Sequence, residues 1–377
     1  MIKRAQIVLI SVLLLLNSCI TQFIPKTSED KEILVVEGLI TDQPAMSSVK
    51  LSKSLPLGGK SAAKTLSGCL ITVSDDLGSI VNFTESSPGT YTPPGSFTGA
   101  SGRFYTLHIK SNSFQTGFNY ESFPVEMKAV PPIDSVYYEK KTIVEGDNYN
   151  QKQEGCQIFV NTHDPSDNCK FFRWEYTETW KFILPYPVKN KACWVSSNSD
   201  IINIKSTSVL GDDKISRYPL NFVSNLSDRL RVKYSILVNQ YSLNEDEYLY
   251  WEKLQNISEQ VGGLYDIIPS SVPSNMFSFA DPNEKVLGYF SVSAITSKRI
   301  FIRDFFEGTV TPYTDELCVA DTIPGLGPIQ NLNYSVWILS QSSIPPPPYT
   351  VTTHEKGCSD CTVRGTNVKP DFWLDDK

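Results

Sequence analysis

Histidine is scarce in this chain, basic clusters are missing, and no apolar run is long enough to cross a membrane. The 377 residues include three histidines, and 34 Lys and Arg stand against 41 Asp and Glu, for a net charge of −7. Nucleic acid is bound through clustered Lys and Arg, so it is not an expected partner. With 40% hydrophobic residues and no three-residue glycine period, the chain is neither disordered nor collagen-like.

The motifs of common enzyme classes are missing as well. There is no Gly-x-Ser-x-Gly elbow, no phosphate-binding glycine loop and no His-Glu-x-x-His sequence. The three histidines, His108, His163 and His354, lie far apart in the sequence. We therefore expect a non-enzymatic protein with no catalytic residue and no cofactor. A hydrolase would require one of these histidines beside a carboxylate and a Ser or Cys in a cleft.

The N-terminus has the pattern of an export signal. Lys3 and Arg4 precede an apolar run from Ile7 to Leu16, which as a helix would extend about 15 Å, half of the ~30 Å hydrocarbon core. Leu16-Asn17-Ser18-Cys19 then resembles the bacterial lipobox, in which the cysteine is acylated and becomes the first mature residue. We expect residues 1–18 to be a lipoprotein signal peptide and acylated Cys19 to hold the protein on a lipid membrane. The alternative is an ordinary signal with an incidental cysteine.

Alternation of apolar and polar residues dominates after a short tether at residues 19–32, and it predicts a mainly-β protein. Short strands separated by Gly, Pro and Asp turns predict an N-terminal β-sandwich at residues 33–129, of immunoglobulin-like or transthyretin-like type. Val130-Pro131-Pro132 marks a boundary, because consecutive prolines favour an extended linker. Residues 130–377 then form a second, mainly-β and sandwich-like domain with a cysteine-containing tail.

The second domain contains the longest alternating run and one helix. Apolar side chains from Phe172 to Phe182 share one parity, which is interrupted on the apolar side by Glu178. A capping-box spacing at Ser242-Leu243-Asn244-Glu245 and an apolar stripe that includes Tyr250 predict a helix at about residues 243–261. We expect this stripe to pack in a core rather than to form a ligand platform.

Seven cysteines remain once Cys19 is set aside, so at least one is unpaired within a monomer. An exported protein meets an oxidising compartment, which favours disulfides. We expect Cys358 and Cys361 to attach the tail to the second domain, with Cys193 and Cys318 as partner candidates and the pairing left open. The alternative is a zinc site formed by His354, Cys358 and Cys361.

Four segments together resemble the domain of unknown function 4249 family, a group of lipoproteins of Bacteroidetes-type bacteria. They are Leu34–Thr41, Pro132–Tyr138, Val286–Phe290 and the terminal Cys-x-x-Cys…Pro-Asp-Phe-Trp stretch at 358–373. Members are often encoded beside TonB-dependent outer-membrane receptors of the SusC-like kind. The resemblance implies an outer-membrane lipoprotein that acts as an accessory partner of such a receptor in nutrient uptake or envelope assembly.

Two questions of function stay open at this point. Surface-displayed lipoproteins of these bacteria usually carry acidic residues soon after the acylated cysteine. Here Ile20 to Pro25 is uncharged, so the membrane face is undecided. The alternative function is a stand-alone carbohydrate- or peptide-binding lipoprotein that uses exposed aromatic side chains such as Trp180, Trp194 or Tyr349.

Overall fold

The computed structural model describes residues 32–54, 64–111, 117–144, 152–259, 272–307, 309, 318–325, 336–344 and 348–374. The protein is mainly β, built from several sheets, which confirms the expected class. No helix within these ranges combines the length and the apolar character needed to cross a membrane. The signal, Cys19 and nearly all of the tether lie outside the described residues.

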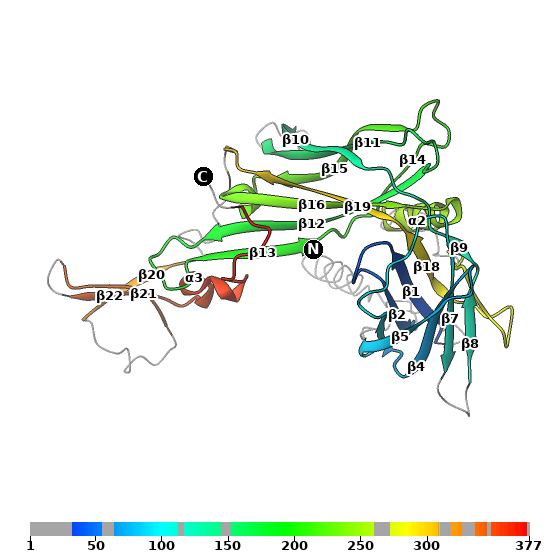
Figure 1. The fold of residues 1–377 in the computed structure, drawn as a ribbon. Coiled ribbons are helices and arrows are strands. Elements are labelled where there is room, and N and C mark those ends of the chain that lie inside the picture. Colours follow the sequence, from blue (N-terminus) through cyan, green and yellow to red (C-terminus); the bar gives the residue numbers. More distant parts are fainter. Residues whose placement is uncertain are drawn as a thin grey trace, which may run out of the picture.

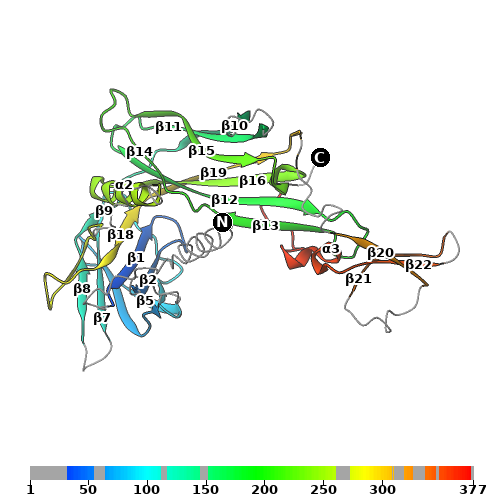
Figure 2. The same cartoon turned by 180° about the vertical axis from the view of Figure 1, so that it is seen from behind.

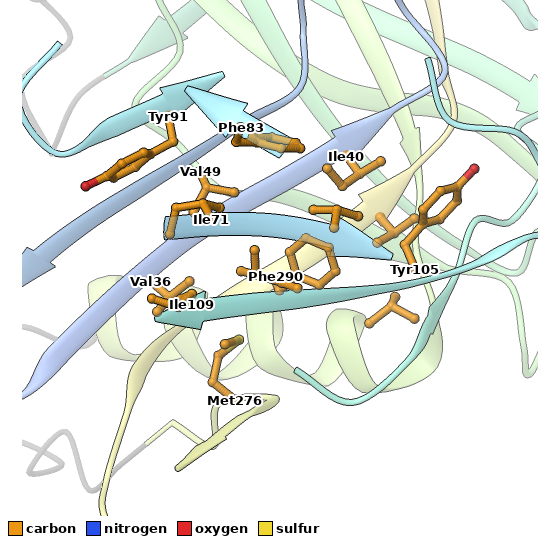
Figure 3. Packing of buried hydrophobic residues seen from close by; sticks show 14 of the residues in the cluster. Val36, Ile40, Val49, Ile71, Phe83, Tyr91, Tyr105, Ile109, Met276 and Phe290 are labelled. Atoms are coloured by element: carbon orange, nitrogen blue, oxygen red, sulfur yellow. The ribbon is translucent and has the colours of Figure 1, made fainter. Parts of the chain in front are cut away.

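The first unit is a sandwich whose strands form one continuous hydrogen-bonded path, in the order β17-β8-β7-β4-β5-β6-β2-β1-β18, with β3 and β9 attached at its side. Side chains of β1, β4, β7 and β18, among them Val36, Ile71, Ile109 and Phe290, meet in a single core (Figure 3). The strands are β1 Leu34–Thr41, β2 Ser48–Lys53, β3 Lys64–Thr65, β4 Cys69–Asp75, β5 Ile80–Ser87, β6 Thr90–Thr92, β7 Phe104–Ser111, β8 Asn119–Ser122, β9 Val125–Glu126, β17 Met276–Ser278 and β18 Leu287–Ser293.

The first unit is not the continuous segment 33–129 that the sequence suggested, because β17 and β18 come from much later in the chain. β18 pairs in parallel with β1, and β17 pairs antiparallel with β8. Gly288 makes this parallel pair possible: its φ is +84°, and a Cβ there would lie 2.0 Å from the carbonyl oxygen of Val36. Local alternation identifies a strand without identifying its partner, and a parallel pair always requires a long connection.

The second unit is also a sandwich, with β10-β11-β15 facing β13-β12-β16-β19, and β14 beside β12. Its core contains the apolar face of β12, including the fully buried Phe172 and Trp174. The expected boundary at Pro131-Pro132 is where β10 begins. The strands are β10 Ile133–Val144, β11 Lys152–His163, β12 Phe171–Ile183, β13 Ala192–Asn198, β14 Asn203–Ser206, β15 Lys214–Ser224, β16 Lys233–Ser242 and β19 Ile295–Ile302, with a 3-10 turn η1 at Asp228–Leu230.

The predicted helix is α2, Glu245–Glu259, and it lies where the two units meet (Figures 1 and 2). Tyr250 packs on Tyr289 of β18 with ring centroids 4.8 Å apart, and Tyr248 packs on Phe171 of β12 at 5.1 Å. The aromatic side chains of the helix therefore join the two units. Residues 260 and 261 of the expected helix lie outside the described residues.

A third, smaller sheet projects from the second unit, on the side opposite the first unit (Figures 1 and 2). It consists of β20 Ala320–Pro324, β22 Tyr349–Thr353 and β21 Trp337–Ser342, in that order across the sheet. We call this sheet the arm. The short helices α3, Lys356–Ser359, and η2, Cys361–Val363, follow it and lead back to the second unit.

Candidate functional site

Two disulfides connect the arm, the tail and the second unit. Cys361 pairs with Cys193 of β13, and Cys358 pairs with Cys318 at the start of the arm. The four cysteines singled out from the sequence are thus joined, and the two sulfurs of the Cys-x-x-Cys turn go to different parts of the protein. One turn of four residues thereby links the arm, through Cys358, to the second unit, through Cys361.

The zinc alternative is wrong, because Cys358 and Cys361 are both consumed in disulfides. His354 faces Asp321, with Nε2 3.4 Å from the carboxylate oxygen. In the described part of the chain, no three His, Cys, Asp or Glu side chains are grouped to hold a metal ion. Among the described cysteines, Cys69, Cys156 and Cys169 are outside the disulfides. Burial raises the pKa of Cys156 and of Cys169 to about 12, so neither is a reactive thiolate at neutral pH.

The arm exposes apolar side chains that a small sheet cannot bury by itself. Its core consists of Leu339 with the Cys318–Cys358 disulfide, against which Val351 packs. The exposed apolar side chains on and beside its strands are Val319 (56%), Trp337 (38%), Ile338 (46%) and Ile344 (78%). Apolar side chains left exposed on a projecting element are typical of surfaces through which proteins contact one another.

The tail beyond the disulfides is clamped onto the second unit. Arg364 donates two hydrogen bonds of 2.6 Å to the carboxylate of Asp228, whose side chain is 4% exposed. Such bidentate pairs fix geometry as well as adding energy. Near the end of the tail, Trp373 is 5% exposed and packs edge-on against Trp194 and Phe301. The terminal motif is therefore an anchor, with Trp373 buried and Phe372 exposed.

His108 lies between a hydroxyl and a carboxylate, as a hydrolase would require. Its Nε2 is 2.7 Å from Ser74 Oγ, and its Nδ1 is 2.9 Å from Glu121 Oε2. The three side chains come from the neighbouring strands β4, β7 and β8. However, β4 is flanked on both sides, by β5 and β7, so the backbone N–H groups near Ser74 are used by the sheet. An oxyanion hole needs backbone N–H groups that are free to donate. Here the three side chains instead form hydrogen bonds across neighbouring strands on the outward face of the sheet.

A cleft of about 480 Å³ opens between the two units, and we call it the junction cleft. Its walls are the outer face of β1 and β2, the strand β18, the helix α2 and the strand β12. Arg173 of β12 lines it, with its guanidinium carbon 4.4 Å from the Trp251 ring centroid and 4.5 Å from that of Tyr241. Arg173 Nη1 also donates to Glu175, which accepts a second hydrogen bond from the Tyr241 hydroxyl at 2.8 Å. The cation is thus held between two rings and beside a carboxylate.

Glu247 of α2 is fully buried next to this cleft. Its Oε1 accepts a hydrogen bond of 3.3 Å from the Trp251 indole, whereas Oε2 has no hydrogen-bond partner. Burial raises the pKa of Glu247, although the charge of Arg173, the Ser291 hydroxyl and the Trp251 indole all oppose this rise. A buried carboxylate without full pairing is costly.

Comparison with known families identifies the chain. The family model described as "Domain of unknown function (DUF4249)" matches residues 20–299. The chain belongs to the DUF4249 family. A search of curated proteins gives no significant match. The matched part of this DUF4249 protein includes the first unit, the junction cleft, and the second unit from β10 into β19, whereas the arm and the clamped tail follow it.

The aromatic residues that the sequence suggested for ligand binding are not exposed in this DUF4249 protein. Trp180 is 7% exposed and Trp194 is 9% exposed, and Tyr349 is half-buried in β22.

His163 pairs with Asp134 at 2.8 Å on the surface of the second unit. The junction cleft was missed because Glu37, Lys50 and Arg173 each look like solvated charges on an alternating strand.

Replacing Glu247 with glutamine should stabilise the protein at neutral and alkaline pH. A carboxyl whose pKa is raised by folding contributes to stability at pH values below the ordinary pKa of Glu. This contribution is lost as the pH rises through the raised pKa of the folded state. Glu247→Gln removes that loss, so its thermal midpoint should exceed the wild-type value at about pH 8 and match it at about pH 4. The matched control is Glu245→Gln, an exposed site on the same helix. An equal or lower midpoint for Glu247→Gln at the higher pH would refute this assignment.

Proposed function

We propose that this DUF4249 protein is a non-enzymatic outer-membrane lipoprotein, anchored by acylated Cys19, that binds a TonB-dependent receptor of the SusC-like kind in nutrient uptake or envelope assembly. The observation that carries the proposal is the arm, a projecting sheet that exposes Trp337, Ile338 and Ile344. The lipobox-like sequence before Cys19 supports the anchor. Membership of the DUF4249 family, matched over residues 20–299, supports a receptor of this kind as the partner, because members are often encoded beside one.

The construction of the arm suits a docking element. One disulfide joins its base to the tail, and a second disulfide and the Arg364–Asp228 pair hold the tail to the second unit. A preorganised element loses little conformational freedom when it binds, so more of the contact energy is available as affinity. The expected tether leads into β1, in the unit at the other end of the molecule, so the arm extends away from the lipid-bearing end of the folded part (Figure 1).

The non-enzymatic part of the proposal rests on two observations. The Ser74, His108 and Glu121 row lies on strands whose backbone donors are already paired. The cysteines of the tail form disulfides. The described residues thus offer neither an activated serine with an oxyanion hole nor a reactive thiol pair.

A charge placed on the arm should weaken receptor binding strongly. Ile338→Asp puts a carboxylate into the exposed apolar surface, and the side chain is 46% exposed, so the fold should tolerate it. The lipidated protein is purified from native outer membranes in mild detergent, and receptor recovery is measured by mass spectrometry. We expect recovery to fall at least about tenfold, as for loss of a central apolar contact.

Leu77→Asp is the matched control, because Leu77 is 76% exposed in a turn of the first unit, away from the arm. It should leave recovery unchanged. If the receptor is recovered equally with Ile338→Asp and with the wild type, the arm is not the binding surface. If the wild type and Leu77→Asp are both recovered without any receptor, the partnership itself is wrong.

A further inference from the structure

The junction cleft has the size and walls of a small-ligand site. Its volume of about 480 Å³ falls within the roughly 300–1,000 Å³ that is usual for ligand pockets. The outer face of β1 and β2 forms one wall, Arg173 and Glu175 of β12 form another, and Trp251 of α2 contributes an aromatic side chain. Sites of this kind occur preferentially where two structural units meet.

The charged side chains that line the cleft have a net charge of zero. Glu37 lies opposite Lys50 across the β1–β2 pair, and both are exposed. Arg173 and Glu175 provide a second cation and a second carboxylate. The lining therefore offers donors and acceptors on both walls without a net charge. A neutral ligand rich in hydroxyl groups matches this pattern, because each hydroxyl both donates and accepts.

Aromatic side chains provide the apolar part of the lining. Trp251, Tyr250 and Tyr289 all line the cleft. Burial raises the pKa of Tyr250 to about 12 and raises that of Tyr289 as well, so both remain neutral phenols that donate and accept hydrogen bonds. Rings next to hydrogen-bonding groups suit the apolar faces and the hydroxyl edges of a sugar ring.

Polar groups at the cleft are incompletely satisfied by the protein itself. The side chain of Arg173 is 8% exposed, and its buried Nε has no hydrogen-bond partner. Oε2 of the buried Glu247, whose Oε1 accepts from the Trp251 indole, has none either. Buried polar groups of native proteins are nearly always paired, so unpaired ones beside a cleft point to a ligand that pairs with them.

We propose that this cleft binds a short neutral oligosaccharide, with Trp251 as its main apolar contact and Lys50, Glu37 and Glu175 as hydrogen-bonding partners of its hydroxyl groups. The proposal concerns a small ligand at the junction of the two sandwiches. It is independent of the arm, so either assignment can fail without the other.

The test is a binding assay on the full mature protein in detergent, with malto-, xylo-, cello- and chito-oligosaccharides as probes. Sialylated and sulfated glycans and short peptides are assayed in parallel. The affinity for the best probe is then measured by calorimetry for the wild type, Trp251→Ala and Lys50→Met. The control is Trp337→Ala, which removes a tryptophan from the arm. Lys50 is exposed, so its variant should fold even if loss of Trp251 disturbs the junction.

We expect at least one neutral oligosaccharide to bind, with affinity lowered roughly tenfold or more by Trp251→Ala and several-fold by Lys50→Met, and unchanged by Trp337→Ala. Three results would overturn the proposal. They are no neutral oligosaccharide bound above background, binding that neither cleft variant weakens, and binding confined to charged glycans or peptides.

Discussion

Replacing Glu178 with alanine should lower the free energy of unfolding of the second unit by about 3–5 kcal/mol, the usual cost of removing one partner from a buried ion pair. Glu178 is 6% exposed in the middle of β12. Its carboxylate accepts hydrogen bonds from Arg229 at 2.9 and 3.0 Å, from the buried Tyr234 hydroxyl and from Asn221 at 3.1 Å. Without it, three donors in or near the core lose their acceptor.

Urea unfolding with and without the substitution measures this effect. Glu178→Gln keeps the size of the side chain and one carbonyl acceptor, so its loss should be smaller than that of alanine. Thr177→Ala, on the polar face of the same strand, is the control and should change stability by less than about 1 kcal/mol. A loss below about 1 kcal/mol for Glu178→Ala would show that the network adds little to the fold.

Removing the disulfide between Cys193 and Cys361 should be the second large effect. The two cysteines are 168 residues apart, whereas Cys318 and Cys358 are 40 apart. A cross-link stabilises a protein mainly by restricting the unfolded chain, and the longer loop restricts it more. The chain-entropy relation gives about 5 kcal/mol for the longer loop and about 4 kcal/mol for the shorter one.

The measurement compares the double variant Cys193→Ala/Cys361→Ala with Cys318→Ala/Cys358→Ala by urea unfolding under non-reducing conditions. Each variant removes both partners, so no free thiol is left to pair wrongly. The first variant should be the less stable of the two. The opposite order, or losses below about 1 kcal/mol in both, would contradict the loop-length argument.

The sequence predicted much of this fold because alternation reports local structure directly. Local sequence patterns predicted the alternating faces of β12, the boundary before β10 and the helix α2. Glu178 was visible as a break in the apolar face of β12, but its partners Arg229 and Asn221 come from segments about 40 to 50 residues away. A break in a pattern therefore located the buried charge, and only the structure supplied its network.

Pairings over long distances in the chain could not be predicted in the same way. Four cysteines were singled out, but the two sulfurs of a Cys-x-x-Cys turn are too close in sequence for spacing to assign their partners. The placement of β18 beside β1 was equally hidden, since a parallel pair leaves no local turn signal. The cleft around Arg173 combines β1, β2, β12, β18 and α2, so no single segment carries its pattern.

The most direct test of the proposed receptor partnership is site-specific photo-crosslinking in intact cells. A photoreactive amino acid replaces Ile338 on the arm, and the same amino acid at Leu77 of the first unit is the control. The account predicts that the arm position crosslinks to a TonB-dependent outer-membrane receptor, identified by mass spectrometry, and that position 77 does not. If no receptor is crosslinked from position 338, or if both positions give the same products, the arm is not the docking element.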